Sequence, residues 1–510
     1  MIGIRPAAAP GALRACVLIA VTVLALLAVR FEATPLLRGP APYPPEWQWA
    51  AGAKPWSARV VPALGCALGL VVLLLLSGRA AAGRRSRAAY GGLLAGATLL
   101  GLGLQLGLRH VDQEGAVAAL VSRTISGSFT SFHRVANSGL ARDPARFLAG
   151  HQEILASLRH RALHAATHPP GPVLFYRGLI ELCRRRRGLT ERLGSVVSAS
   201  GLETAPLASP PPSPEAIGAA LLGPLLLGLL GAMACWPTAA LARSVHGDAA
   251  AAARTGVLWT MVPALALMTP ELDQALALPV TASVAALAAA LRPEAGRARL
   301  VGHAAAAGLL AAVAEFFSYG AAVFVLIGAL AVLAWRGWES RRRAAAAVGL
   351  AMAAGAAVIG LERLAGHRPL ASALTALSIH RQHFTVRRSY LAWLAFDPVD
   401  LFWFLGPPLV LLVVAVGLRS VIRSARVGDA AVERFQATAV LGVAALVLSG
   451  IVRGEAGRIL IPVMPVLLVA AVAGKEPGVT APGPSVRFSV LLAVLLTATS
   501  VVIRLTWDVP

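Results

Sequence analysis

Apolar stretches separated by short polar and basic segments fill most of the chain. They cover residues 15–29, 60–76, 90–108, 215–242, 255–270, 274–291, 300–316, 318–335, 344–361, 400–418, 436–452, 459–473 and 487–504. A helix needs about 20 mainly apolar residues to cross a bilayer, and most of these stretches approach that length. The pattern predicts an all-α polytopic membrane protein with about 13 transmembrane helices.

One long polar stretch, residues 108–214, interrupts this pattern. Polar groups are costly in lipid, so an insert of this length lies in water or at the interface. Its most apolar part, residues 171–183, is shorter than a transmembrane helix. If it crossed the membrane, the Arg-rich loops at 292–299 and 336–343 would face outside, against the positive-inside rule. We therefore expect juxtamembrane helices within a long extracytoplasmic loop.

Composition and charge narrow the class of protein. The 510 residues are 57% hydrophobic and 14% charged, which excludes an ordinary soluble domain. A net charge of +22 would favour nucleic-acid binding in a soluble protein, but no nucleic-acid-binding motif accompanies it. We expect no nucleic-acid partner, because basic loops that orient helices and contact anionic membrane lipids account for the charge. The four cysteines lack metal-ligand spacing.

The predicted helices divide the chain into three parts. Residues 1–88 form a transmembrane pair with an outer loop, residues 89–475 form the core, and residues 476–510 hold the last transmembrane helix. The core contains a second outer loop, 362–400, which is rich in His and Arg and includes His380, His383, Arg387 and Arg388. These side chains lack the spacing of a metal site, so we interpret the loop as a basic surface or a substrate-binding loop.

Several polar clusters fall on the same outer face in this topology. They are Asp112 with Glu114, Asp143, His168, Glu271 with Asp273, and Arg453 with Glu455 and Arg458. Acids held beside hydrocarbon are expensive, so their convergence indicates a functional site. Each cluster also has a structural interpretation: solvated turns or helix caps for the acids and the histidine, and an Arg–Glu–Arg ion network for the last group.

The order of these elements resembles the GT-C superfamily of polyprenyl-phosphate-sugar-dependent glycosyltransferases. That superfamily includes protein mannosyltransferases, aminoarabinose transferases and actinobacterial cell-wall arabinosyl- and mannosyltransferases. The resemblance covers about residues 90–475. Its elements are an outer loop that opens with acids, His-Pro-Pro before an amphipathic helix, and the sequences RSVHGD at 243–248, PELD at 270–273 and RGEAGR at 453–458.

The resemblance implies roles for particular residues. The first-loop acid of the family falls on Asp112, followed by Glu114. Because Gln113 separates a pair that is often adjacent in the family, Asp143 is the alternative. Asp273 corresponds to the acid after the fifth span, and His168 to the His-Pro-Pro element. The catalytic residues expected are thus Asp112, Glu114, Asp143 and Asp273, and the substrate-binding residues His168, Arg453, Glu455 and Arg458.

The function expected is an inverting glycosyltransferase of the cell membrane, with its site at the extracytoplasmic face. It would move a sugar from a polyprenyl-phosphate-linked donor to a hydroxyl of a glycan, lipid or protein acceptor. A carboxylate would take the acceptor proton, and arginine or a divalent cation (Mg²⁺ or Mn²⁺) would stabilise the leaving phosphate. The alternative is a multi-span transporter or lipid-carrier flippase, which predicts charges near the bilayer midplane and often an internal repeat.

Overall fold

The computed structural model describes residues 10–42, 45–82, 86–127, 130–337, 339–424, 431–474 and 483–509. These residues are mostly helical. The sheet found among them has two antiparallel strands, β1 (Ala50–Ala51) and β2 (Trp507–Asp508), with Ala50 opposite Asp508. This pairing joins the first loop of the chain to its C-terminal segment.

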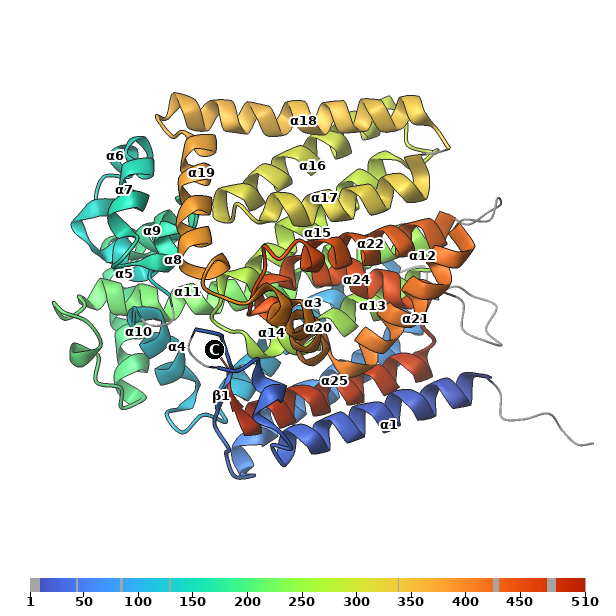
Figure 1. Cartoon of the computed structure of the whole chain (residues 1–510), viewed down its shortest axis with the longest axis horizontal. Helices are drawn as coiled ribbons and strands as arrows, with labels where there is room; N and C mark the ends of the chain where they lie inside the picture. The colour runs from blue at the N-terminus through green and yellow to red at the C-terminus, as the bar shows by residue number, and fades with distance from the viewer. Residues whose placement is uncertain are drawn as a thin grey trace, which may run out of the picture.

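Ten helices in the described ranges are long and apolar enough to cross a membrane, counting α11 with α12 and α13 with α14 as one each. They are α1 (Pro10–Arg30), α2 (Val61–Ala82), α3 (Ser86–Arg109), α11 (Pro214–Met233) with α12 (Cys235–His246), α13 (Ala249–Trp259) with α14 (Pro263–Leu267), α15 (Leu272–Ala290), α16 (Arg297–Phe317), α18 (Arg341–Leu364), α22 (Ala431–Leu448) and α25 (Val486–Thr506). Most run side by side along the long axis of the molecule (Figure 1). The protein is an all-α polytopic membrane protein, as the sequence predicted.

The number of spans depends on the remaining apolar helices. The chain bends by 119° between α20 (Tyr390–Leu405) and α21 (Pro407–Ser424). If these two helices form one broken span, the number of candidate spans is eleven. Three apolar helical segments are shorter than a full span: α4 (Gly115–Ile125), α17 (Ala321–Val332) with the π-helical turn after it, and α24 (Met464–Val472) with the turn before it. The count of thirteen stays a prediction.

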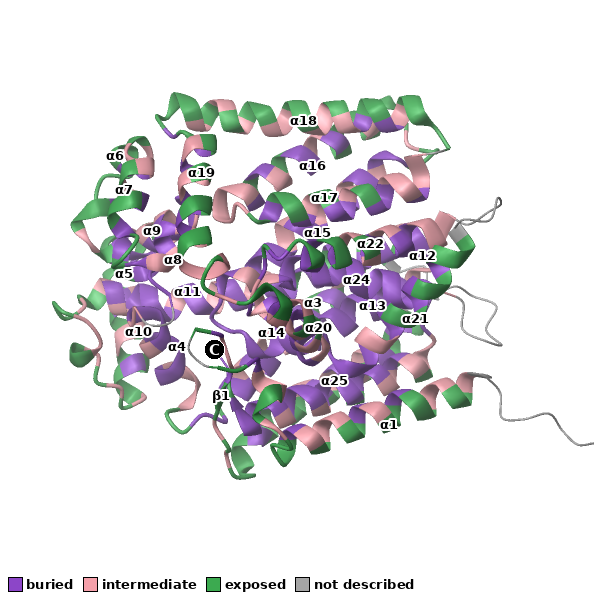
Figure 2. Cartoon of the chain, viewed as in Figure 1, coloured by how far each residue is buried: buried purple, intermediate pink, exposed green. Residues whose placement is uncertain are grey.

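Small residues and lipid-facing side chains explain how the bundle packs. A Cβ added at Gly308 of α16 would collide with the carbonyl oxygen of Ala351 in α18, so glycine permits this close approach. Leu24, Leu68 and Met352 are exposed on the outer surface of the bundle. Figure 2 shows the same contrast, with α1 and α18 largely exposed and α13 and α24 buried. Exposed apolar faces of this kind suit contact with lipid.

The polar insert folds into seven short helices at one end of the bundle (Figure 1, left). They are α4, α5 (Phe132–Asn137), α6 (Pro144–Ala149), α7 (His151–Leu158), α8 (Leu163–Ala166), α9 (Gly171–Arg185) and α10 (Arg187–Ala199). Phe132, Phe147, Leu155, Tyr176 and Ile180 are buried in a core that α5 to α9 share with α11, α15 and α19. The apolar segment 171–183 lies within α9 and is helical. Its position outside the membrane stays a prediction.

The expected outer loop 362–400 is mostly helical, and its position outside the membrane stays a prediction. α18 continues to Leu364, α19 (Pro369–His380) follows and runs into a π-helical turn (Arg381–Thr385), and α20 begins at Tyr390. Pro at the first position and a run of Ala, Leu and Ser favour the α19 helix despite its polar flanks. The 3₁₀ and π-helical turns elsewhere are Pro35–Arg38, Ala58–Val60, Gly139–Ala141, Ala205–Leu207, Leu333–Gly337 and Ile461–Val463.

Candidate functional site

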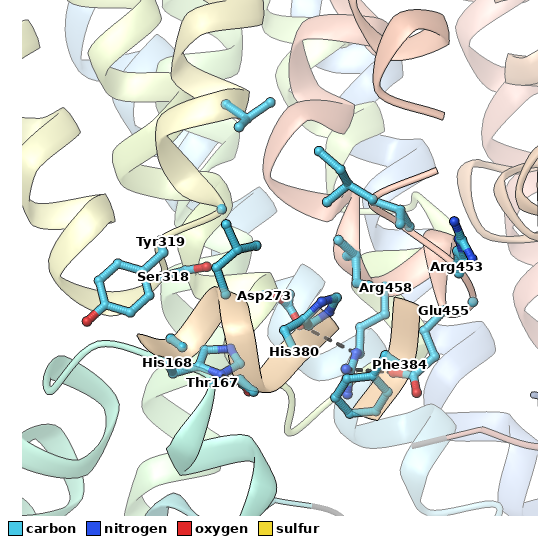
Figure 3. Close-up of a pocket in the computed structure, with 18 of the residues that line it drawn as sticks. Thr167, His168, Asp273, Ser318, Tyr319, His380, Phe384, Arg453, Glu455 and Arg458 are labelled. Atoms are coloured by element: carbon cyan, nitrogen blue, oxygen red, sulfur yellow. Dashed lines mark hydrogen bonds and ion pairs between the residues drawn. The ribbon is translucent and has the colours of Figure 1, made fainter. Parts of the chain in front are cut away.

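A cavity of about 270 Å³ opens at the end of the bundle that carries the helices of the insert (Figure 3). Its walls come from α8 and the segment after it, the start of α15, the α16–α17 turn, α19 with its π-helical turn, and the turn before α23 (Ala456–Ile459). Its polar lining consists of His164, Thr167, His168, Asp273, Ser318, Tyr319, His380, Arg388, Arg453, Glu455 and Arg458. Segments from five separate parts of the sequence thus meet at one cavity.

The cavity separates the residues expected to act together into two groups. His168, Asp273, Arg453, Glu455 and Arg458 line it. The remaining candidates, which are the acids of the polar insert, do not line it: they are Asp112, Glu114 and Asp143. The chemistry available in the cavity is therefore that of the first group.

Arg458 is the centre of the charged part of the cavity. Its guanidinium lies 2.6 Å from Glu455, 3.2 Å from Glu271 and 3.5 Å from Asp273. The two short turns that stood out in the sequence, 270–273 and 453–458, therefore meet through this residue. Three carboxylates around one cation leave an excess of negative charge if all are ionised, which favours proton uptake by one of them.

The donor set does not fit a divalent cation well. In the described part of the chain, no group of three His, Cys, Asp or Glu side chains is arranged to hold a metal ion. The three carboxylates nearest the cavity instead surround the guanidinium of Arg458, which already supplies positive charge there. We therefore derive no step through a metal, and the divalent cation that the sequence left open as an alternative to arginine stays untested.

Two aspartates of α20, not singled out as catalytic from the sequence, hold the turn that carries Glu455. Asp397 accepts a hydrogen bond from the backbone N–H of Gly454 at 3.3 Å, and Asp400 accepts one from Gly457 at 2.8 Å. Glu455 has a φ of +58°, a left-handed conformation that is costly outside glycine and persists only where surrounding contacts impose it. The i,i+3 spacing of Asp397 and Asp400 inside an apolar helix was the sequence signal that could have found these two aspartates.

The guanidinium of Arg453 is hydrogen-bonded to backbone carbonyl groups. Its Nε donates to Gly450 O at 2.9 Å, and its Nη1 donates to Arg388 O at 2.8 Å and to Thr385 O. Arg388 donates to Arg453 O in return, and its guanidinium lies over the rings of Phe384 and Trp393. Arg453 thus fastens the turn to the segment after α19, and Arg388 is the arginine of this pair that has more donors left for a ligand.

The histidines of the cavity are held neutral. Burial lowers the pKa of His168 to about 3, and burial with the nearby Arg458 lowers that of His164 to about 4. Nδ1 of His168 donates to His164 O at 2.8 Å, which leaves Nε2 of the neutral ring as an acceptor. His168 therefore closes the turn after α8, as its structural interpretation predicts, and also offers a hydrogen-bond acceptor to the cavity.

Asp112 lies in a buried ion cluster behind the cavity. Its carboxylate is 2.6 Å from Lys54, 3.1 Å from Arg109 and 3.6 Å from Arg504. Burial alone would raise the pKa of Asp112, but Arg504, Arg109 and Lys54 together hold it below its ordinary value. A carboxylate with a lowered pKa and three cationic partners is a poor general base.

The same cluster positions the turn that carries the cavity acids. Arg109 Nε donates to Thr269 O at 2.8 Å, and Arg504 Nη2 donates to Leu267 O at 3.0 Å. These carbonyls lie just before Glu271 and Asp273. Asp112 thus acts on the cavity from a distance, by neutralising the two arginines that fix the end of α14.

Replacing Asp112 with Asn is expected to lower stability rather than remove a base. The change leaves two buried guanidiniums without their carboxylate, and losing hydrogen bonds to a charged group costs about 1.5–3 kcal/mol. Thermal unfolding of the purified protein measures the loss. An Asp112→Asn variant that melts like wild type yet has lost all turnover would instead support the role that the sequence assigned to Asp112.

The other two acids of the insert act at helix ends. Asp143 is exposed and caps α6 through the N–H groups of Ala145 at 3.0 Å and Arg146 at 3.2 Å. Glu114 is the residue before α4 and accepts a hydrogen bond from Ser122 at 3.4 Å. Asp143 matches the helix-cap interpretation, whereas the side chain of Glu114 accepts no hydrogen bond from the first N–H groups of α4. Neither side chain lines the cavity.

Comparison with protein families, with curated proteins and with solved structures finds no match to this chain. Its function is therefore argued from the geometry of the cavity, together with the resemblance carried by the short sequences described above.

Proposed function

We propose that this protein is a membrane glycosyltransferase that transfers a sugar, with inversion, from a polyprenyl-phosphate-linked donor to an acceptor hydroxyl at the extracytoplasmic face. The observation that carries the proposal is the meeting of Asp273, Glu455, Arg458 and His168 in one cavity at the end of an apolar helix bundle. The cavity adjoins the helices of the insert, which would lie outside under the predicted thirteen-span topology.

Asp273 is the base in this proposal. It lies in the first turn of α15 and is 3.5 Å from Arg458, whereas Glu455 is tied to the same arginine at 2.6 Å. The acceptor oxygen attacks the anomeric carbon as its proton passes to Asp273, and the bond from that carbon to the phosphate oxygen breaks with its electron pair on the phosphate. Nε2 of His168 is placed to accept a hydrogen bond from a sugar hydroxyl.

The leaving polyprenyl phosphate gains negative charge, which a guanidinium stabilises. Arg388 is the best placed for this contact, because it lines the cavity and Arg453 and Arg458 are engaged by carbonyls and carboxylates. An apolar side of the cavity suits the lipid. Val323, Leu377 and Ile451 line it and are 40%, 56% and 54% exposed, so the lining continues onto the lipid-facing surface.

A transfer assay with reconstituted protein tests this function directly. The protein, in proteoliposomes, is given a panel of radiolabelled polyprenyl-phosphate sugars with candidate acceptors. We expect label to pass from one donor to one acceptor class with release of polyprenyl phosphate. If no sugar is transferred from any donor but a labelled lipid moves between leaflets, the flippase alternative replaces this proposal.

A further inference from the structure

Positive side chains from two separate segments meet beside the cavity and form a basic rim. The rim consists of Arg159 and His160, after α7, and of Arg381, His383 and Arg387, in and after the π-helical turn that follows α19. The rings of His160 and His383 are 5.7 Å apart, which joins the two segments. The neighbouring residues Phe384 and Arg388 line the cavity, so the rim borders its entrance.

The arginines of the rim differ from others on the same end of the molecule. Arg184 and Arg185 of α9 both pair with Glu181 at 2.7 Å. Arg159, Arg381 and Arg387 are exposed, and within the described residues none of them forms an ion pair with a carboxylate. Positive charge is thus concentrated at the rim, where these three arginines have no carboxylate partner among the described residues.

The histidines of the rim lie among these charges. Arg159 Nε donates a hydrogen bond to His160 Nε2 at 3.1 Å. Burial, followed by the charges of Arg387, His160 and Arg159, lowers the pKa of His383. Like charges crowded at one place repel one another, and a bound anion relieves that repulsion.

We propose that the basic rim binds phosphate or carboxylate groups of an anionic glycan, which is the acceptor, and so delivers its hydroxyl to the cavity. The inference rests on the proposed function. Guanidinium groups bind such anions through paired hydrogen bonds, and arginines from two segments suit a chain that carries repeated charges. Arg159 and His160 belong to the polar insert, and its expected position outside the membrane favours a ligand in water over a lipid headgroup.

Binding to the rim can be measured without any sugar donor. Protein in nanodiscs of phosphatidylcholine is titrated into end-labelled inorganic polyphosphate and into end-labelled oligogalacturonate, and fluorescence anisotropy is followed. The measurements are made at about 0.01 M and about 0.1 M salt, between which the screening length falls from roughly 30 to 10 Å. We expect binding of at least one probe that weakens as salt rises.

The double substitution Arg159→Gln with Arg387→Gln is expected to weaken probe binding about tenfold or more, because it removes two charge-assisted contacts to the anion; a tenfold loss corresponds to about 1.4 kcal/mol. The matched control is Arg184→Gln with Arg185→Gln, which removes the same charge from arginines that already pair with Glu181. The control is expected to bind nearly as well as wild type.

Three outcomes would overturn the inference: no binding of either probe, equal binding by the rim variant and wild type, or an equal loss in the control. Binding confined to vesicles containing phosphatidylglycerol, and lost in the rim variant, would make the rim a lipid-headgroup site instead. Because the assay needs no turnover, Asp273→Asn should bind the probes normally. Intact probe binding by a wild-type protein that transfers no sugar would therefore refute the proposed function and the acceptor role, but not the anion site.

Discussion

Replacing Asp273 with Asn is expected to reduce sugar transfer by about 100- to 10,000-fold, which is the range that general bases contribute. The substitution keeps the shape of the side chain and removes the charge that receives the acceptor proton. The fold should survive, because an acid in the first turn of a helix contributes only about 0.3–1 kcal/mol and Arg458 keeps Glu455 and Glu271 as partners. Single-turnover transfer and thermal unfolding, measured on the same preparation, separate the two effects.

Asp143→Asn is the matched control, since Asp143 is an exposed helix cap outside the cavity. It should keep its turnover and lose about 1 kcal/mol or less of stability. Near-normal turnover in Asp273→Asn would transfer the role of base to Glu455. If Glu455→Gln were also fully active, the carboxylate mechanism would have to be abandoned.

The helical architecture could be predicted because the bilayer imposes a length and a polarity on every span. The contrast between apolar spans and polar turns also made Glu271, Asp273 and Arg458 recognisable, since charged residues stand out in tight turns between apolar segments. The structure brings these turns together, with Arg458 3.2 Å from Glu271 and 3.5 Å from Asp273. The short helices 321–337 and 461–472 show the limit, because hydropathy alone does not say whether they cross the membrane.

The surroundings of Asp112 could not be predicted from the sequence. Its partners Lys54 and Arg504 lie in the first loop and in the last long helix, and they approach only because α25 packs against α2 and α3. An acid beside an apolar span therefore has the same sequence signature whether it is neutralised by distant cations or open to a substrate. Tertiary packing decides between the two, and here it surrounds Asp112 with positive charge.

The residues that hold the turn 453–458 could not be predicted from the sequence for a related reason. Asp397 and Asp400 occur within an apolar segment, and Asp397 was placed in the expected outer loop 362–400. Their importance comes from the backbone N–H groups of Gly454 and Gly457, which a sequence pattern does not place. Sequence reasoning thus found the charged residues that face the cavity more readily than the residues that hold them there.

Removing the charge of Arg458 is expected to destabilise the protein by about 3–5 kcal/mol, because Arg458→Gln leaves buried carboxylates without their cation. Arg458→Lys keeps the charge but loses the planar fork that reaches several carboxylates at once, so a smaller loss is expected. Thermal unfolding of wild type and both variants, in the same detergent, gives the comparison.

The pH dependence of that loss distinguishes a charge effect from lost packing. Burial raises the pKa of Glu271 to about 7 even though Arg458 opposes the rise. A carboxyl group whose folded pKa lies above its unfolded value of about 4.3 favours folding more at low pH, and this advantage is lost as pH rises through the folded pKa. Without Arg458 the rise in the pKa of Glu271 is larger, so the stability deficit of Arg458→Gln should grow as pH rises above about 7 and should be smaller below that pH. A deficit of the same size below and above pH about 7 would show that Arg458 contributes through packing and not through the charge of the carboxylates.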